Sequence, residues 1–264
     1  MPTFFANGAT LFYDQVGTGP DLILISGFTA SHEAWRPLLP YLVKHFTVTV
    51  FDNRGVGQSS IDGVDYSIDL MADDIIAIMD HLDITSAFIA GHSMGGFILQ
   101  SLSARYSGRV KRAIFVCSRL MENPRYDLHN QLNQAIASSQ IDDSALYKSQ
   151  ALFLFGSRAL GRAGFINQFI EFRRLNPQSD VGMQGQFDAI QSFDRLRYLK
   201  SVGEAVSCGA VYGEDDLIAP PQTADFIQQI IPACDVSVIS GCGHIPQMER
   251  PKAFAEIIGQ WCID

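Results

Sequence analysis

The sequence predicts an α/β fold: a mostly parallel sheet with an antiparallel hairpin at its start and a helical insertion. Short, continuous apolar runs alternate with helical patterns along much of the 264-residue chain, as in sheets whose strands are buried on both faces. Asn7-Gly8 separates the first two strand-like runs, and this dipeptide is the strongest short signal for a hairpin. The alternation stops at about Met121 and resumes after Lys200.

The individual elements follow from local pattern. Strands are predicted first for the hairpin pair, which is short and rich in aromatic and β-branched residues, and then for each buried apolar run. In chain order, the strands are expected at residues 3–5, 9–16, 22–26, 46–51, 86–90, 113–117, 205–212 and 235–240. Helices are predicted where apolar residues recur with a period near 3.6 residues. In chain order, the helices are expected at residues 33–45, 69–82, 96–106, 223–231 and 252–261.

Residues 121–200 are predicted to form a helical cap, and residues 1–120 and 201–264 are predicted to form the core. An interruption of about 80 residues is long enough to be a small unit of its own. The insertion holds nine Lys and Arg against eight Asp and Glu, whereas the core holds ten against twenty. Either the cap is simply near neutral, or its arginines admit an anionic substrate or an acidic partner. The arginines concerned are Arg125, Arg158, Arg162, Arg173 and Arg174.

Composition and short patterns exclude several classes of protein. A hydrophobic content of 47% with 18% charged residues indicates a compact fold, and the net charge of −9 argues against a nucleic-acid partner. No apolar stretch approaches the roughly 18 residues of a membrane span, and the N-terminal residues do not resemble a signal peptide. The five cysteines are odd in number, and no Cys/His spacing suggests a metal site. We expect a cytoplasmic protein with reduced thiols, no membrane partner, no metal and no cofactor.

Residues 91–95, GHSMG, carry the main chemical signal. They match G-x-S-x-G directly after a predicted strand and directly before a helical pattern. In that setting the motif forms a nucleophile elbow, a sharp turn that holds a serine hydroxyl above the sheet. Glycines two residues before and after Ser93 allow the tight turn and close helix packing. Ser93 is therefore the candidate nucleophile.

A serine nucleophile needs a general base and a third group that orients the base. In folds with a nucleophile elbow, the chain order is serine, acid, histidine. Three consecutive acids follow the seventh predicted strand, and His244 follows the eighth. Because catalytic groups gather at the carboxyl ends of parallel strands, these two loops are expected to meet near Ser93.

With these motifs the chain resembles an α/β-hydrolase-fold serine hydrolase over essentially its whole length. Residues 51–59, FDNRGVGQS, are similar to the D-x-R-G-x-G-x-S loop of that family. Residues 213–220 resemble its acid loop, and residues 243–251 resemble its histidine loop. The resemblance implies an α/β-hydrolase fold in which the insertion is the cap over the catalytic serine.

Catalytic roles are implied position by position. By the resemblance, Ser93 is the nucleophile, His244 is the general base and Asp216 is the orienting acid. Glu214 and Asp215 are rivals for the acid, and the family's glycine-plus-three spacing with a following proline favours Asp216.

The resemblance also implies an oxyanion hole formed by the backbone N–H groups of Phe28 and Met94. Ser26 stands where relatives commonly have histidine. That change leaves the Phe28 donor intact, because the donor is main chain, but it alters how the loop is braced.

Other conspicuous residues are given structural roles. His92 is expected to pack or lie on the surface, pointing away from Ser93, and Cys242 is expected to be a buried loop thiol. Arg54 is expected to brace loops by ion pairing. Five phenylalanines of the insertion stand out, most of them expected in the core of the cap and one or two in an acyl pocket: Phe153, Phe155, Phe165, Phe169 and Phe172.

The predicted function is hydrolysis of a small to medium carboxylic ester through an acyl-enzyme, with a small-molecule ester or lactone as substrate. A 3-oxoadipate-type enol-lactonase and an acyl-carrier-protein methyl esterase of the biotin pathway remain alternatives, and both would use cap arginines for anionic groups. Arg158 and Arg162, one helical turn apart, suit the latter. A meta-cleavage C–C hydrolase usually has Trp where Ile245 stands, and a receptor with slow turnover is the non-enzymatic alternative.

Overall fold

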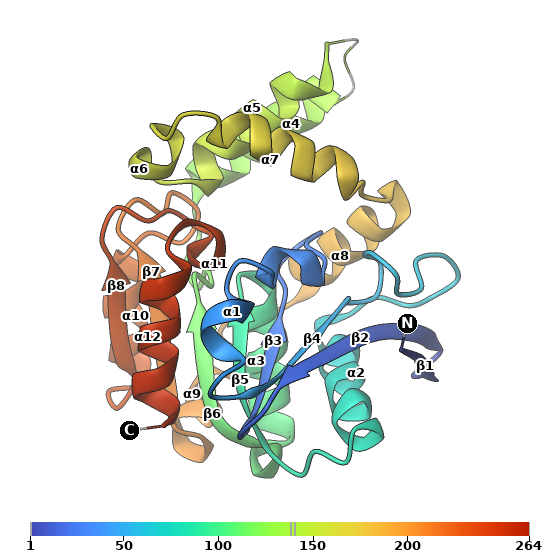
Figure 1. Ribbon diagram of the computed structural model, residues 1–264, viewed down its shortest axis with the longest axis vertical. Coiled ribbons are helices and arrows are strands. Elements are labelled where there is room, and N and C mark those ends of the chain that lie inside the picture. The colour runs from blue at the N-terminus through green and yellow to red at the C-terminus, as the bar shows by residue number, and fades with distance from the viewer. Residues whose placement is uncertain (1, 138, 140, 264) are drawn as a thin grey trace.

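Eight strands form one sheet in the computed structural model, which describes residues 2–137, 139 and 141–263 (Figure 1). Their spatial order is β1-β2-β4-β3-β5-β6-β7-β8. The bounds are β1 Thr3–Ala6, β2 Ala9–Gly17, β3 Asp21–Ile25, β4 Thr47–Phe51, β5 Ala87–His92, β6 Val110–Val116, β7 Cys208–Gly213 and β8 Asp235–Ile239. All eight predicted strands are present within a few residues, and the predicted α/β-hydrolase fold class is confirmed.

The sheet starts antiparallel and continues parallel, as predicted. Asn7 and Gly8 turn the chain between β1 and β2 with φ angles of 50° and 77°, as a two-residue hairpin with both central residues at positive φ requires. β2 pairs antiparallel with β4, and every following pair in the sheet is parallel. The carboxyl ends of β3 to β8 therefore share one edge of the sheet.

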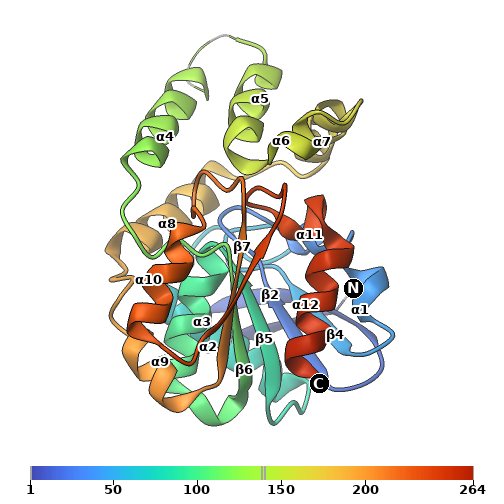
Figure 2. The ribbon, with the colours of Figure 1, turned by 90° about the vertical axis from the view of Figure 1, so that its left-hand side faces the viewer.

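Helices cover both faces of the sheet, and the faces are best seen edge-on (Figure 2). One apolar layer packs under α2 (Ile68–His81), α3 (Met94–Arg105), α9 (Leu199–Ala205) and α10 (Gln222–Ile230). The other packs under α1 (Leu39–Leu42) and α12 (Pro251–Cys262). The strands between them are almost entirely buried, which explains their unbroken apolar runs.

Several predicted bounds were wrong, among them the start of β6, which lies at Val110 and not at residue 113. The helix predicted at 33–45 is instead a 3-10 helix, η1 (His32–Trp35), followed by the single turn of α1. Pro37 and Pro40 lack the N–H groups that a continuous helical ladder needs. The strand predicted to start at residue 205 starts at Cys208, because Ala205 still belongs to α9.

The insertion is helical and stands over the carboxyl ends of the strands (Figures 1 and 2). It contains α4 (Pro124–Ala137), α5 (Asp143–Leu154), α6 (Ser157–Leu160), α7 (Phe165–Leu175) and α8 (Asp180–Ser192). A small apolar cluster holds α5 to α7 together and includes Ile245 of the core. The division at residues 120 and 200 stays a prediction.

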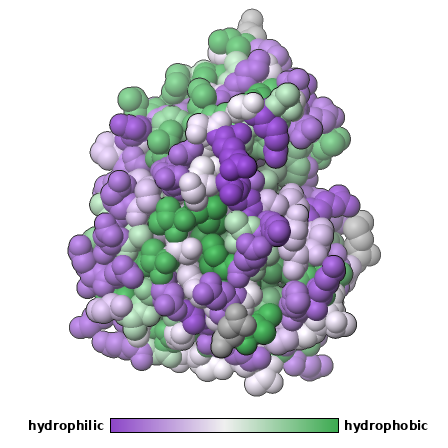
Figure 3. Space-filling view, turned by 60° about the vertical axis from the view of Figure 1, so that its left-hand side comes forward, coloured by the Kyte–Doolittle hydropathy of each residue, from purple (hydrophilic) through white to green (hydrophobic). Residues whose placement is uncertain are grey.

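The face of the molecule in Figure 3 is largely polar. Hydrophilic side chains dominate the face in Figure 3, around an apolar area near its middle. Across the described ranges, none of the helices combines the length and the apolar character that crossing a membrane would require.

Candidate active site

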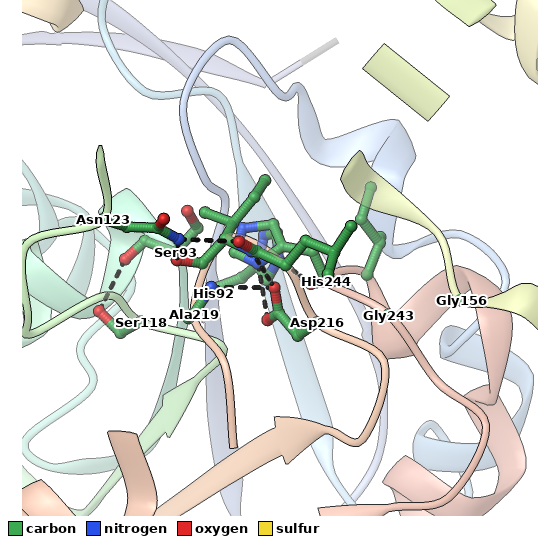
Figure 4. A network of polar contacts seen from close by, with 12 residues as sticks. His92, Ser93, Ser118, Asn123, Gly156, Asp216, Ala219, Gly243 and His244 are labelled. Carbon is green, nitrogen blue, oxygen red and sulfur yellow. Dashed lines mark hydrogen bonds and ion pairs between the residues drawn. The ribbon is translucent and has the colours of Figure 1, made fainter. Parts of the chain in front are cut away.

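Ser93 sits at the junction of β5 and α3 with a strained backbone, φ 53° and ψ −113°. A non-glycine residue in this region of conformational space is costly and persists only where its surroundings hold it. The Ser93 N–H donates to Val116 O at 2.8 Å, and the Ser118 hydroxyl donates to Ser93 O at 2.9 Å (Figure 4). A Cβ at Gly91 would lie 2.3 Å from Gly95 O, so the turn closes too tightly for a side chain there.

The predicted base and acid are in direct contact. His244 Nδ1 and Asp216 Oδ2 are 2.9 Å apart, and both side chains are buried (Figure 4). The other carboxylate oxygen of Asp216 accepts the N–H groups of Ile218 at 2.8 Å and Ala219 at 2.9 Å. These bonds fix the carboxylate, so that it can hold the imidazole in one orientation and favour a proton on Nδ1.

The two rival acids have other partners. Glu214 accepts the Ser240 hydroxyl at 2.7 Å and the Gly241 N–H at 2.9 Å. Asp215 points to the cap, where it accepts both the N–H and the hydroxyl of Ser157 at 2.9 and 2.7 Å. Among these three carboxylates in the described chain, the contact with His244 belongs to Asp216.

His92 is buried, in keeping with the predicted packing role, but it also supports the catalytic loop. Its Nε2 donates to His244 O at 2.8 Å. Burial and the neighbouring His244 lower the pKa of His92 to about 3, so the ring stays neutral with its proton on Nε2. No local pattern signals this contact, because it joins residues far apart in the chain.

The loop that carries the Phe28 amide is braced from α8. Gln186, fully buried, accepts the Thr29 N–H at 2.8 Å and donates to Arg54 O at 2.9 Å. Gln178 donates to Thr29 O at 3.0 Å. The sequence did not single out these glutamines, because one more polar residue in a glutamine-rich segment carries no signal.

At the start of the same loop, the Ser26 hydroxyl accepts the indole N–H of Trp35 at 2.9 Å. Ser26 therefore has a defined bracing role where relatives commonly have histidine. The position of the Met94 amide is set by the elbow itself, since Met94 is the first residue of α3. Their function as oxyanion donors stays a prediction.

Arg54 braces loops, as predicted. Its guanidinium is fully buried and forms two hydrogen bonds with Asp74, Nε to Oδ2 at 2.8 Å and Nη2 to Oδ1 at 2.7 Å. It also donates to Asp65 O at 2.7 Å. Burial raises the pKa of Asp74, and the bonds from Arg54 oppose that rise.

Two adjoining cavities lie between the core and the cap. The first, here the serine cavity, has a volume of about 180 Å³ and is lined by Ser93, His244 and Phe28 as well as by cap residues. The second, here the cap cavity, has a volume of about 360 Å³ and lies between α4, α5, α7 and α8. Both are lined by Phe28, Gln150 and Arg173, among others.

The five phenylalanines singled out in the insertion divide between two roles. Phe155, Phe165 and Phe169 are buried in the core of the cap. Phe153, Phe169 and Phe172 line the serine cavity. Aromatic side chains at this wall would favour an apolar portion of a substrate next to Ser93.

The five cap arginines proposed as anion-binding candidates lie in different places. Arg173 lines both cavities, whereas Arg174 on the same helix forms an exposed ion pair with Asp143 at 2.6 Å. Arg158 and Arg162 line a separate surface depression with Arg250. Arg125 is exposed on α4.

The histidine loop is tied to the cap mainly through main-chain groups. The His244 N–H donates to Leu154 O at 2.8 Å. The buried carboxylate of Glu249 accepts the N–H groups of Gly156 at 2.8 Å and Gly243 at 3.0 Å. Burial raises the pKa of Glu249, and these amide donors oppose the rise.

One group of possible metal ligands is found in the described ranges: Cys117, Asp216 and His244, whose ligand atoms lie within 4.8 Å of one another. Two of them are already hydrogen-bonded to each other. Burial, followed by the nearby Asp216 carboxylate, raises the pKa of the Cys117 thiol well above its usual value. A neutral thiol is a poor metal ligand, so this group fits a hydrogen-bonded acid and base better than a metal centre.

Comparison with known proteins agrees with the fold. The profile of the alpha/beta hydrolase fold family matches residues 20–251. A protein of Mycobacterium tuberculosis provisionally named non-heme bromoperoxidase BpoC is 26% identical over 249 residues, covering 92% of this chain and 94% of that protein. Karrikin insensitive 2 receptor IA of Petunia hybrida is 26% identical over 256 residues, covering 92% and 90%. The enol-lactonase structure from Burkholderia xenovorans LB400 superposes with a TM-score of 0.85 at 22% identity, covering 100% of both chains. The chain belongs to the alpha/beta hydrolase fold family.

Proposed function

We propose that this α/β-hydrolase-family protein is a serine hydrolase that cleaves carboxylic esters, including cyclic ones, through an acyl-enzyme. The observation that carries the proposal is the combination of a strained Ser93 with a buried His244–Asp216 hydrogen bond at one cavity. Strain at a nucleophile is retained where function needs it, and a fixed acid–histidine pair supplies the base that a serine hydroxyl lacks.

In the first half of the reaction, Ser93 Oγ attacks the carbonyl carbon while His244 accepts the hydroxyl proton. Asp216 stabilises the imidazolium that forms and does not take the proton itself. The Phe28 and Met94 amides donate to the oxyanion of the tetrahedral intermediate. Its collapse breaks the C–O bond, and His244 gives the proton to the leaving alcohol.

In the second half, water replaces the alcohol. His244 removes a proton from the water, whose oxygen attacks the acyl carbon, and the acid is released with Ser93 restored. When the substrate is a lactone, the acid and the alcohol remain part of one molecule. The cap limits bulk water around the intermediate, and its aromatic wall suits an acyl chain of small to medium size.

The test is steady-state and burst-phase hydrolysis of p-nitrophenyl butyrate by the wild type and by Ser93→Ala. We expect a burst of p-nitrophenol in the wild type and a loss of at least about 10⁴-fold in kcat for Ser93→Ala. Ser192→Ala, at an exposed position on α8, is the control and should keep full activity.

Two outcomes would contradict the proposal. Turnover retained in Ser93→Ala would exclude Ser93 as the nucleophile. A single burst equal to the enzyme concentration, with no turnover after it on any ester or lactone, would favour a receptor over an enzyme.

A further inference from the structure

Arg173 occupies an unusual place for a guanidinium. It lies on α7 and lines both the serine cavity and the cap cavity. Within the chain as described, it is the one arginine or lysine that borders both. Its side chain is partly buried, and the loss of water around it lowers its pKa.

Among the side chains that the structure describes, Arg173 has no anionic partner. No ion pair or hydrogen bond between these side chains involves its guanidinium, and its buried Nε is without a hydrogen-bond acceptor. The guanidinium lies over the ring of Tyr147, 5.5 Å from the ring centroid. A desolvated cation without a counter-charge is costly, so the site is incomplete as it stands.

Nearby arginines do not share this property. Arg174, the next residue along, pairs with Asp143, and Arg119 at the edge of the cap cavity pairs with Asp127 at 3.5 Å. Of the cap arginines that form no ion pair among the described residues, Arg173 is the one that borders the two cavities, whereas Arg158 and Arg162 line a separate surface depression.

The other residues that line the cavities also favour the binding of an anion. The serine cavity has no Asp or Glu among its described lining residues, although the whole chain carries a net charge of −9. Four amide side chains border both cavities and can donate to an oxyanion: Asn130, Asn133, Gln150 and Gln178. One exposed carboxylate, Asp180, borders the cap cavity.

We propose that Arg173 binds a carboxylate on the substrate, so that the natural substrate is an ester or lactone bearing a free carboxylate remote from the scissile carbonyl. Guanidinium and carboxylate match in two-point geometry, and the substrate would supply the counter-charge that Arg173 lacks. This inference rests on the proposed hydrolase function and adds the class of substrate. The scissile ester would lie at Ser93 and the carboxylate in the direction of the cap cavity.

The experiment compares matched anionic and neutral esters. Monoethyl esters of succinate, glutarate, adipate and pimelate are assayed by pH-stat beside ethyl butyrate, pentanoate, hexanoate and heptanoate. In the wild type we expect kcat/KM to be at least 10-fold higher for the best half-ester than for its neutral counterpart. Arg173→Gln should lower that half-ester value by about 10- to 100-fold, mainly through KM, as for loss of a charged hydrogen bond. The neutral ester should change by less than about two-fold.

Two variants separate charge from structure. Arg173→Lys keeps the charge and should recover part of the half-ester activity, and Arg174→Gln should leave both substrates unchanged. The proposal is overturned if Arg173→Gln lowers both ester series equally, or if the wild type does not prefer any half-ester.

A binding experiment tests the carboxylate site without relying on turnover. Monoethyl adipate and its homologues are titrated calorimetrically into Ser93→Ala and into Ser93→Ala with Arg173→Gln. We expect Kd to rise at least 10-fold in the double variant. If p-nitrophenyl butyrate is hydrolysed through Ser93 but Kd does not change, the carboxylate site fails and the hydrolase proposal stands. If Kd rises but no ester is turned over, the hydrolase proposal fails and the carboxylate site stands.

Discussion

The loops at the strand ends and the helices of the cap are held in different ways. Around Ser93 the loops are fixed by buried or partly buried hydrogen bonds, such as those between Asp216 and His244 and between Gln186 and Thr29. The cap has a small apolar cluster, and several large apolar side chains on α4 and α5 remain exposed. Loss of an interaction should therefore lower activity or stability more at the strand-end loops than within the cap. Three pairs of substitutions test this expectation.

The largest expected effect separates two adjacent acids, one facing the core and one facing the cap. Asp216→Asn should lower kcat on p-nitrophenyl butyrate by about 10⁴-fold, because the amide no longer holds the required tautomer of His244. Asp215→Asn, whose carboxylate contacts Ser157 instead, should change kcat by less than about five-fold. Equal losses in the two variants would show that the acid has been assigned to the wrong residue.

The next effect compares two ion pairs by urea unfolding. Asp74→Ala should lower the free energy of unfolding by about 3–5 kcal/mol, because it leaves Arg54 buried without a counter-charge. Asp143→Ala breaks the exposed pair with Arg174 in the cap and should leave the free energy of unfolding nearly unchanged. The m-value should stay constant in both variants. If Asp143→Ala lowered the free energy of unfolding as much as Asp74→Ala, the proposed difference between core and cap would be wrong.

The smallest effect concerns two glutamines of α8. Gln186 contacts Thr29 of the Phe28 loop, whereas Gln184 contacts Asp188 on its own helix. Gln186→Ala leaves the Thr29 N–H without its acceptor and should lower kcat by about 10-fold with little change in KM, since it loosens the Phe28 loop. Gln184→Ala loses an exposed contact with Asp188 and should leave kcat unchanged. A rise in KM with kcat intact would instead place Gln186 in substrate binding.

Much of the core and the identity of the candidate triad could be predicted from sequence, because each depends on local pattern. An elbow needs glycines at fixed distances from Ser93, and a buried strand needs a short apolar run. The failed helix at 33–45 shows the limit of periodicity where two prolines intervene. Chain order then brings the acid and histidine loops to the same edge of the sheet.

The supporting contacts could not be predicted, because they join residues that no local pattern connects. Gln186 and Thr29 are 157 residues apart, and His92 and His244 are 152 apart. The same reason explains the arginines. Sequence spacing drew attention to Arg158 and Arg162, whereas the fold turns those two to a separate depression and Arg173 to the cavities.

The contact between the cap and the histidine loop determines how far the cap sequence can be replaced. A Cβ on Gly243 would lie 2.4 Å from Gly156 N, so the two backbones touch where they cross. The contacts there use the Leu154 carbonyl and the Gly156 amide, which any cap sequence can supply if it keeps a glycine at that crossing. The sequence of α5 to α7 could therefore change widely, by evolution or by grafting, while the position of His244 is inherited unchanged. The part of the insertion that would have to be kept is α8, because Gln186 braces the Phe28 loop through its side chain.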